Sequence, residues 1–193
     1  MRFRLTYSGS LPPARKDNRR VEEKWAIRKH IHPQIQDLYK QEHILSTPPI
    51  LMTWTRNEWT PEDKVDAPRK VGSREFIPLI REKLHMVCDL DITLLSAGSE
   101  SSVITKEGDL DHRLTTLFDG LKMPTEPDMK GAGDIEQPFY CLMDDDARII
   151  SLTVHKDRLL SPPDIDFYAL LLIDVTIRIL KVTPDNNRFV GAS

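Results

Sequence analysis

The chain has few cysteines, few glycines and no long hydrophobic run, and each shortage excludes a class of protein. Its two cysteines, Cys88 and Cys141, lack the spacing of a zinc site and lie in apolar runs typical of buried thiols in a reducing compartment. Its eight glycines form no phosphate-binding loop. No apolar run approaches the roughly 20 residues of a membrane helix, and the first residues favour a strand over a signal peptide. The sequence therefore predicts a soluble, cytoplasmic protein outside any membrane.

Charge is distributed unevenly along the 193 residues, which are enough for one domain with a substantial core. Residues 1–40 carry ten Lys or Arg against four Asp or Glu, whereas residues 107–146 carry eleven acidic residues against three basic ones. A nuclease needs a basic surface for phosphates and an acidic pocket for a metal ion. The distribution fits that class, although the net charge is −3.

Hydrophobic periodicity predicts an α+β fold. Strands are expected at residues 2–9, 86–95, 139–143, 149–154 and 168–182, and helices at 19–41 and from Asp109 toward Pro124. Pro78 limits 76–80 to an edge strand at best, and Asp174 within the last strand needs a partner or an edge position. We expect one domain over residues 1–185, with loop insertions at 46–72 and 124–137, and a disordered tail at 186–193.

Two acidic clusters are the most informative feature of the chain. Asp109 and Asp111 open the second expected helix, and Asp144 to Asp146 connect an apolar run to a strand. Mg²⁺ takes oxygen ligands and needs only one or two carboxylates besides water and phosphate. Asp109 and Asp111 converge only if Asp109 is extended and Asp111 lies in the first helical turn. The alternative is that these acids cap an ordinary helix and form a solvated turn.

The two clusters occur within longer motifs. Asp109-Leu110-Asp111, Leu117-Phe118-Asp119-Gly120-Leu121 and the segment from Leu142 to Ala147 resemble the RusA family of Holliday-junction resolvases. The family pattern is Asp-Leu-Asp-Asn, a Lys four residues after the second Asp, Phe-Asp-Ala-Leu, and later Asp-Asp-Ala before a strand. Tyr7 to Pro13 and Trp25 to Gln34 resemble a longer, mostly uncharacterised branch of that family.

The resemblance implies a small mixed β-sheet with helices packed on one side. It also implies a homodimer that cleaves branched DNA in recombination or repair. The implied cofactor is Mg²⁺, which Mn²⁺ can replace. The family's essential acids fall on Asp109, Asp111 and Asp146, which would coordinate the metal and activate water. Asp145 is a further candidate carboxylate ligand.

The chain departs from the family at two positions. His112 stands where the family has Asn, and Thr115 stands where it has the catalytic Lys, whose charge a threonine cannot replace. Arg113 or Lys106 is a neighbouring cation that could substitute. Two alternatives therefore stay open: a catalytically impaired nucleic-acid-binding relative, and a partner-binding protein whose acidic clusters are only caps and turns.

The basic N-terminal segment supplies candidates for contact with DNA. An apolar stripe through Trp25, Ile31 and Ile35 predicts an amphipathic helix, so the alternative for its charges is a solvated face. The residues expected to contact nucleic acid are Arg15, Lys16, Arg19, Arg20, Lys29 and Arg113.

Overall fold

The computed structural model describes residues 1–14, 20–42, 45, 68–96, 110–183 and 185–190. Within these ranges, the strands are β1 (Arg2–Ser10), β2 (Arg69–Val71), β3 (Arg74–Ile80), β4 (Met86–Ser96), β5 (Phe139–Met143), β6 (Ile149–Arg158) and β7 (Tyr168–Ile179). The α-helices are α1 (Val21–Gln41) and α4 (Leu110–Leu121). Short 3₁₀ helices are η2 (Glu82–Leu84), η4 (Glu126–Gly131), η5 (Asp146–Arg148) and η6 (Asn187–Phe189).

The strands form two mixed sheets. The larger has the order β1-β7-β4-β6, with β7 antiparallel to both of its neighbours and β4 parallel to β6. The smaller has the order β2-β3-β5, with an antiparallel β2–β3 pair and a parallel β3–β5 pair. The predicted α+β class is confirmed, with the strands divided between two sheets.

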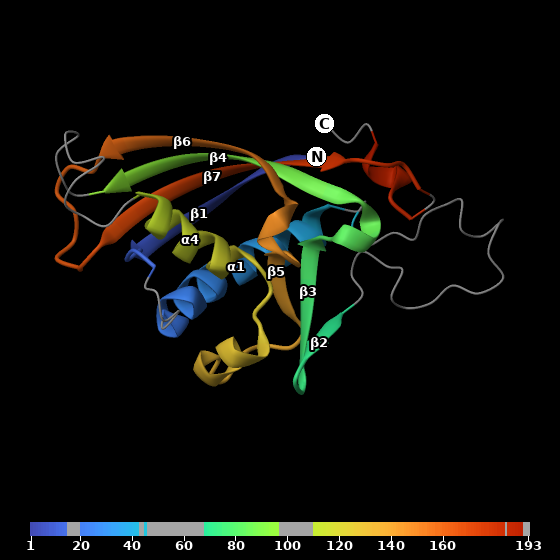
Figure 1. The fold of residues 1–193 in the computed structure, drawn as a ribbon, viewed down its shortest axis with the longest axis horizontal. Coiled ribbons are helices and arrows are strands. Elements are labelled where there is room, and N and C mark those ends of the chain that lie inside the picture. The colour runs from blue at the N-terminus through green and yellow to red at the C-terminus, as the bar shows by residue number, and fades with distance from the viewer. Residues whose placement is uncertain (15–19, 43–44, 46–67, 97–109, 184, 191–193) are drawn as a thin grey trace.

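Both α-helices lie on the same face of the larger sheet, and the smaller sheet stands beside them (Figure 1). On β4, Leu90, Ile92 and Leu94 are buried in the core between sheet and helices, while Asp91 on the opposite face is exposed. This is the alternation expected of a strand with one covered face. The core therefore fixes which face of each strand remains on the surface.

Helix α1 packs against the core and also contacts the end strand β1. Trp25, Ile31 and Ile35 are buried along its apolar stripe, as predicted, and Pro33 lies within the helix. The side chain of Gln34 accepts a hydrogen bond from the Thr6 amide (2.9 Å) and donates one to the Thr6 carbonyl (2.8 Å). Because β1 is the end strand of its sheet, these bonds cover part of an open edge.

Most predicted elements are confirmed, and Asp174 has the required partner, since Arg4 donates two hydrogen bonds to its carboxylate. The prediction of an edge strand at 76–80 is wrong, because β3 is the central strand of its sheet. Its register with β2 covers only Arg74 to Phe76, so Pro78 lies beyond the β2 pairing. Residues 69–71 of the expected 46–72 insertion form β2, and 46–67 lie outside the described residues.

Two other segments are more ordered than predicted. Within 124–137, η4 begins with a capping box between Thr125 and Asp128, and Asp128 is buried. The predicted disordered tail is wrong for residues 186–190. Asn186 is fully buried and donates hydrogen bonds to the carbonyls of Leu84 and Lys181, and Phe189 packs into the core.

Candidate functional site

The second acidic cluster lies between β5 and β6, where the sequence predicts it, and its carboxylates have different partners. Asp144 is almost buried and accepts hydrogen bonds from the Arg69 side chain (3.2 Å) and the Glu82 amide (3.0 Å). Asp145 caps η5 by accepting from the Ala147 amide (2.9 Å). The Asp146 side chain is 40% exposed and accepts from Lys122 Nζ at 2.9 Å. Asp146 is thus the member of the cluster that combines exposure with a bound ammonium group.

Lys122 belongs to a chain of alternating charges that runs from the interior to the surface. Arg28 lies 3.2 Å from Asp128, and Lys24 lies 3.9 Å from Asp128. Asp119 then lies 2.9 Å from both Lys24 and Lys122. Side-chain exposure rises from 1% at Arg28 to 40% at Asp146. In order, the members are Arg28, Asp128, Lys24, Asp119, Lys122 and Asp146, which we call the charge chain.

The local structure explains why these side chains meet. Lys24 and Arg28 are four residues apart on α1 and therefore share a face of that helix. Asp119 and Lys122 lie three residues apart at the end of α4. The Arg28 guanidinium also donates to the carbonyls of Asp119 (2.6 Å) and Lys122 (3.3 Å). Because the last carbonyls of a helix lack intrahelical partners, Arg28 caps α4 as well as pairing with Asp128.

The charge chain favours the ionised forms of Asp119 and Lys122. Burial alone would raise the pKa of Asp119, but hydrogen bonds from Lys24 and Lys122 outweigh it and hold that pKa below its ordinary value. Burial would lower the pKa of Lys122, yet hydrogen bonds to Asp146 and Asp119 leave it raised. Lys122 therefore stays a cation beside Asp146 across the physiological pH range.

Asp111 of the first acidic cluster lies at the other end of α4. Asp111 is exposed in the first turn, as predicted, and Asp109 lies outside the described residues. Lys122 directly follows α4 and comes eleven positions after Asp111, a rise of about 16 Å along the helix axis. Asp111 is in the first turn of α4, whereas Asp146 pairs with Lys122 beyond the last turn. The structure therefore does not bring the two carboxylates together. Within the described ranges, no group of three or more His, Cys, Asp or Glu side chains could hold a metal ion.

Thr115, at the position of the family's Lys, is exposed on α4, and its hydroxyl donates to the Asp111 carbonyl at 3.0 Å. Lys122 comes seven residues after Thr115, directly beyond the last residue of α4, and is therefore about two helical turns away. Lys122 is not among the residues that the motifs predict for the site. A signal was available, because it follows the Phe-Asp-x-Leu motif and is spaced to pair with Asp119.

The predicted nucleic-acid-binding residues have different environments. Lys29 is exposed on α1. Arg20 forms an ion pair with Glu23 (2.8 Å) and donates a hydrogen bond to the Pro13 carbonyl (3.3 Å). Arg113 is 5% exposed and donates to the carbonyls of Leu11 (2.8 Å) and Phe167 (3.2 Å), which gives it a structural role inside the protein. Outside the described residues lie Arg15, Lys16, Arg19 and Lys106.

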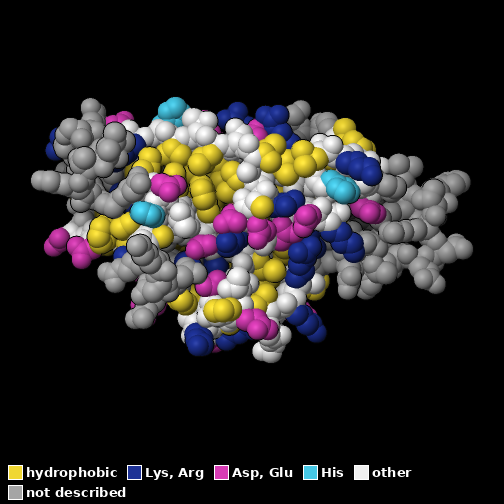
Figure 2. Space-filling model, viewed as in Figure 1, with side chains coloured by type: hydrophobic (Ala, Val, Ile, Leu, Met, Phe, Trp, Pro, Cys, Tyr) yellow, Lys and Arg dark blue, Asp and Glu magenta, His cyan; other side chains and the backbone are white. Residues whose placement is uncertain are grey.

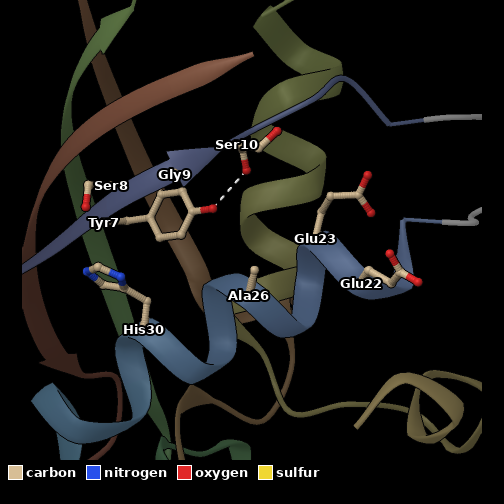
Figure 3. Close-up of a pocket in the computed structure, with 8 residues that line it drawn as sticks. All are labelled: Tyr7, Ser8, Gly9, Ser10, Glu22, Glu23, Ala26 and His30. Carbon is tan, nitrogen blue, oxygen red and sulfur yellow. Dashed lines mark hydrogen bonds between the residues drawn. The ribbon is translucent and has the colours of Figure 1, made fainter. Parts of the chain in front are cut away.

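A pocket of about 440 Å³ opens between β1 and the first turns of α1 (Figure 3). Tyr7, whose hydroxyl donates to the Ser10 carbonyl at 2.8 Å, lies beside His30 in its wall. Burial and the nearby Glu23 raise the pKa of Tyr7 to about 12. Because Glu22 and Glu23 are the acidic side chains of its lining, this pocket does not suit a phosphate group.

Comparison of the chain with protein-family models, curated proteins and solved structures gives no match. The resemblance to the RusA family therefore rests on the motifs of the chain itself. Among the described helices, none combines the length and the apolar character needed to span a membrane.

Proposed function

We propose that this protein is a cytoplasmic, metal-dependent endonuclease that cleaves branched DNA as a homodimer, in recombination or repair. The observation that carries the proposal is the Lys122 ammonium, held 2.9 Å from the carboxylate of Asp146. Asp146 matches an essential acid of the RusA motif. The Lys122 ammonium supplies, beside this acid, the positive charge that the family's Lys carries and that Thr115 lacks.

A magnesium site at Asp146 would need ligands beyond this one described carboxylate. Mg²⁺ retains several waters and commonly uses one or two carboxylates together with oxygens of the substrate phosphate. Asp146 is exposed enough to contribute a ligand, and Asp109 would have to come from outside the described residues. When bound, such an ion would polarise the phosphate and lower the pKa of a bound water.

Lys122 has the chemistry to take the role of the family's Lys. Its ammonium is a compact charge with three donors, suited to a phosphate oxygen. Asp119 holds the side chain from the opposite side at 2.9 Å, so the ammonium is positioned before substrate arrives. The buried Lys24 in turn fixes Asp119. We assign Lys122 to the stabilisation of charge on the scissile phosphate.

The test is cleavage of a labelled four-way DNA junction in Mg²⁺ by the wild type and Asp146→Asn. We expect symmetric nicks from the wild type and a loss of about 100-fold or more in rate for the variant. The matched control is Asp157→Asn. Asp157 is exposed near the other end of β6, so this variant should cleave the junction at the wild-type rate. Equal rates for Asp146→Asn and the wild type would contradict the proposal.

A second candidate is a nucleic-acid-binding protein that has lost cleavage. The position of Asp111 at the far end of α4 from Asp146 favours it, as does Thr115. The same assay separates the two functions, since this candidate binds the junction without nicking it in Mg²⁺ or Mn²⁺. If the protein neither binds nor cleaves the junction, the result favours the partner-binding alternative.

A further inference from the structure

Within the described structure, the side chain of Arg148 is largely buried and yet makes no hydrogen bond. It is 17% exposed, and its ion-pair partner is Glu82, whose Oε1 lies 3.7 Å from a terminal nitrogen of the guanidinium. The Nε–H group of Arg148 is buried and has no hydrogen-bond partner among the described residues. Buried donors without a partner are rare in native proteins and need an explanation, such as a functional role or a bound species.

Two other buried arginines of the chain have close partners. Arg28 donates to the end of α4 and pairs with Asp128 at 3.2 Å, and Arg113 donates to two backbone carbonyls. The contact between Arg148 and Glu82 is longer than a hydrogen bond, and the Glu82 side chain is 78% exposed. An ion pair with such an exposed carboxylate contributes little to stability. The Arg148 guanidinium therefore carries donors that no described group uses.

Backbone hydrogen bonds hold Arg148 beside Asp146. The two residues are the last and the first of η5, and the Arg148 amide donates to the Asp145 carbonyl at 3.1 Å. A 3₁₀ helix rises about 2.0 Å per residue, so the two positions lie about 4 Å apart along its axis. Phosphates of one DNA strand follow each other about every 3.4 Å along the duplex axis. If one phosphate lies at Lys122 and Asp146, the long arginine side chain is placed to meet a neighbouring one.

The acidic residues near Arg148 are paired with other cations. Asp144 lies 3.2 Å from Arg69, and Asp146 lies 2.9 Å from Lys122. Figure 2 shows acidic and basic side chains interspersed across the middle of this face, where Figure 1 draws the ends of α4 and β5. Because these acids have their own cations, Arg148 keeps its charge for a further anion. A guanidinium presents parallel donors that match two oxygens of one phosphate.

We propose that Arg148 binds the DNA phosphate next to the scissile one, and that it leaves Glu82 when DNA binds. This inference rests on the proposed function, because it takes the scissile phosphate to lie at Lys122 and Asp146. A phosphate contact fixes the position of the strand on the protein without reading the base sequence. The contribution of Arg148 should therefore appear in the affinity for DNA and in its dependence on salt.

The test is the affinity of the full chain for a labelled four-way DNA junction, measured in Ca²⁺ between about 50 and 200 mM KCl. Each phosphate contact contributes about −0.9 to the slope of log Kobs against log[KCl]. We expect Arg148→Met to bind about tenfold more weakly and to have a slope less steep by about 0.9. The matched control is Arg158→Met. Arg158 is exposed at the far end of β6, so this variant should keep the wild-type affinity and slope.

Two further variants separate a phosphate contact from a structural role of the ion pair. Arg148→Lys keeps the charge but loses the parallel donors, so we expect the wild-type slope with a weaker affinity. Glu82→Gln removes the carboxylate that faces Arg148 and should bind the junction at least as tightly as the wild type. If Glu82→Gln instead weakened binding as much as Arg148→Met, the ion pair would be structural and the proposal would be overturned.

The outcomes distinguish this inference from the proposed function. A wild-type affinity and salt slope in Arg148→Met would overturn the phosphate contact alone, since the junction would still be bound. A wild type that binds no junction would overturn the proposed function together with this inference. Arg148→Gln, which also removes the charge, supplies the same measurement if Arg148→Met does not fold.

Discussion

Asp119 receives ammonium groups from two directions, and one of them, Lys24, is only 3% exposed. Replacing Asp119 with Asn takes from Lys24 its nearest carboxylate and leaves Asp128 at 3.9 Å. We expect the free energy of unfolding to fall by about 2–3 kcal/mol, measured by urea denaturation. Asp37→Asn should cost less than about 0.5 kcal/mol, because Asp37 and Lys40 form an exposed pair. Similar losses in both variants would show that the charge chain contributes little.

The pH dependence of stability follows from the same side chain. The pKa of Asp119 in the folded protein lies below its ordinary value of 3.8, so its contribution is present above that value and is lost as the pH falls through the folded pKa. The pKa of Lys122 is raised above 10.5, so its contribution is present below that value and is lost as the pH rises through the folded pKa. Asp119→Asn should flatten the acid limb of the stability curve relative to the wild type.

How far the site can be predicted depends on where the partners of each residue lie in the sequence. The turn at Asp144 to Asp146 is predictable because apolar runs on both sides fix its place. Lys24 and Arg28 are not predictable, because their carboxylate partners follow about 90–100 residues later. Sequence periodicity places Arg28 on the buried stripe of α1 but does not say which charge it meets there.

Helices α1 and α4 lie close together at Gly120. A Cβ atom there would lie 2.7 Å from both Cβ and Cγ2 of Ile27, so the helices would have to move apart. We expect Gly120→Ala to lower the melting temperature, because overpacking costs about 1–3 kcal/mol and exceeds the gain of about 1 kcal/mol in helix propensity.

The control for this helix contact is Thr115→Ala, an exposed change on α4 that should leave the melting temperature the same or raise it. A higher melting temperature for Gly120→Ala would contradict the close packing of the two helices. Thermal unfolding followed by circular dichroism measures both variants.

Strands and helices with strong periodicity are predicted well, and the failures are long-range. β3 is central because β5 joins it from about 60 residues further along the chain, which the local proline signal at Pro78 does not reveal. The C-terminal segment is ordered because Asn186 meets the Leu84 carbonyl and Phe189 enters the core. In both places distant contacts override a correct reading of local composition.

At the scale of the whole molecule, the central question is which end of α4 contacts the reacting phosphate. The motifs lead us to expect Asp109, Asp111 and Asp146 at one centre, whereas Asp111 and Asp146 lie at opposite ends of α4 in the described structure. The charge chain ends at the exposed carboxylate of Asp146. We therefore place the reacting phosphate at the Lys122 end.

The most direct test is single-turnover cleavage of a labelled four-way junction in Mg²⁺ by Lys122→Met. We predict a rate about 100-fold below that of the wild type, with unchanged junction binding measured in Ca²⁺. Lys130→Met, which changes an exposed lysine of η4, should cleave like the wild type. Cleavage by Lys122→Met at the wild-type rate, or no cleavage by any of the three proteins, would contradict the account.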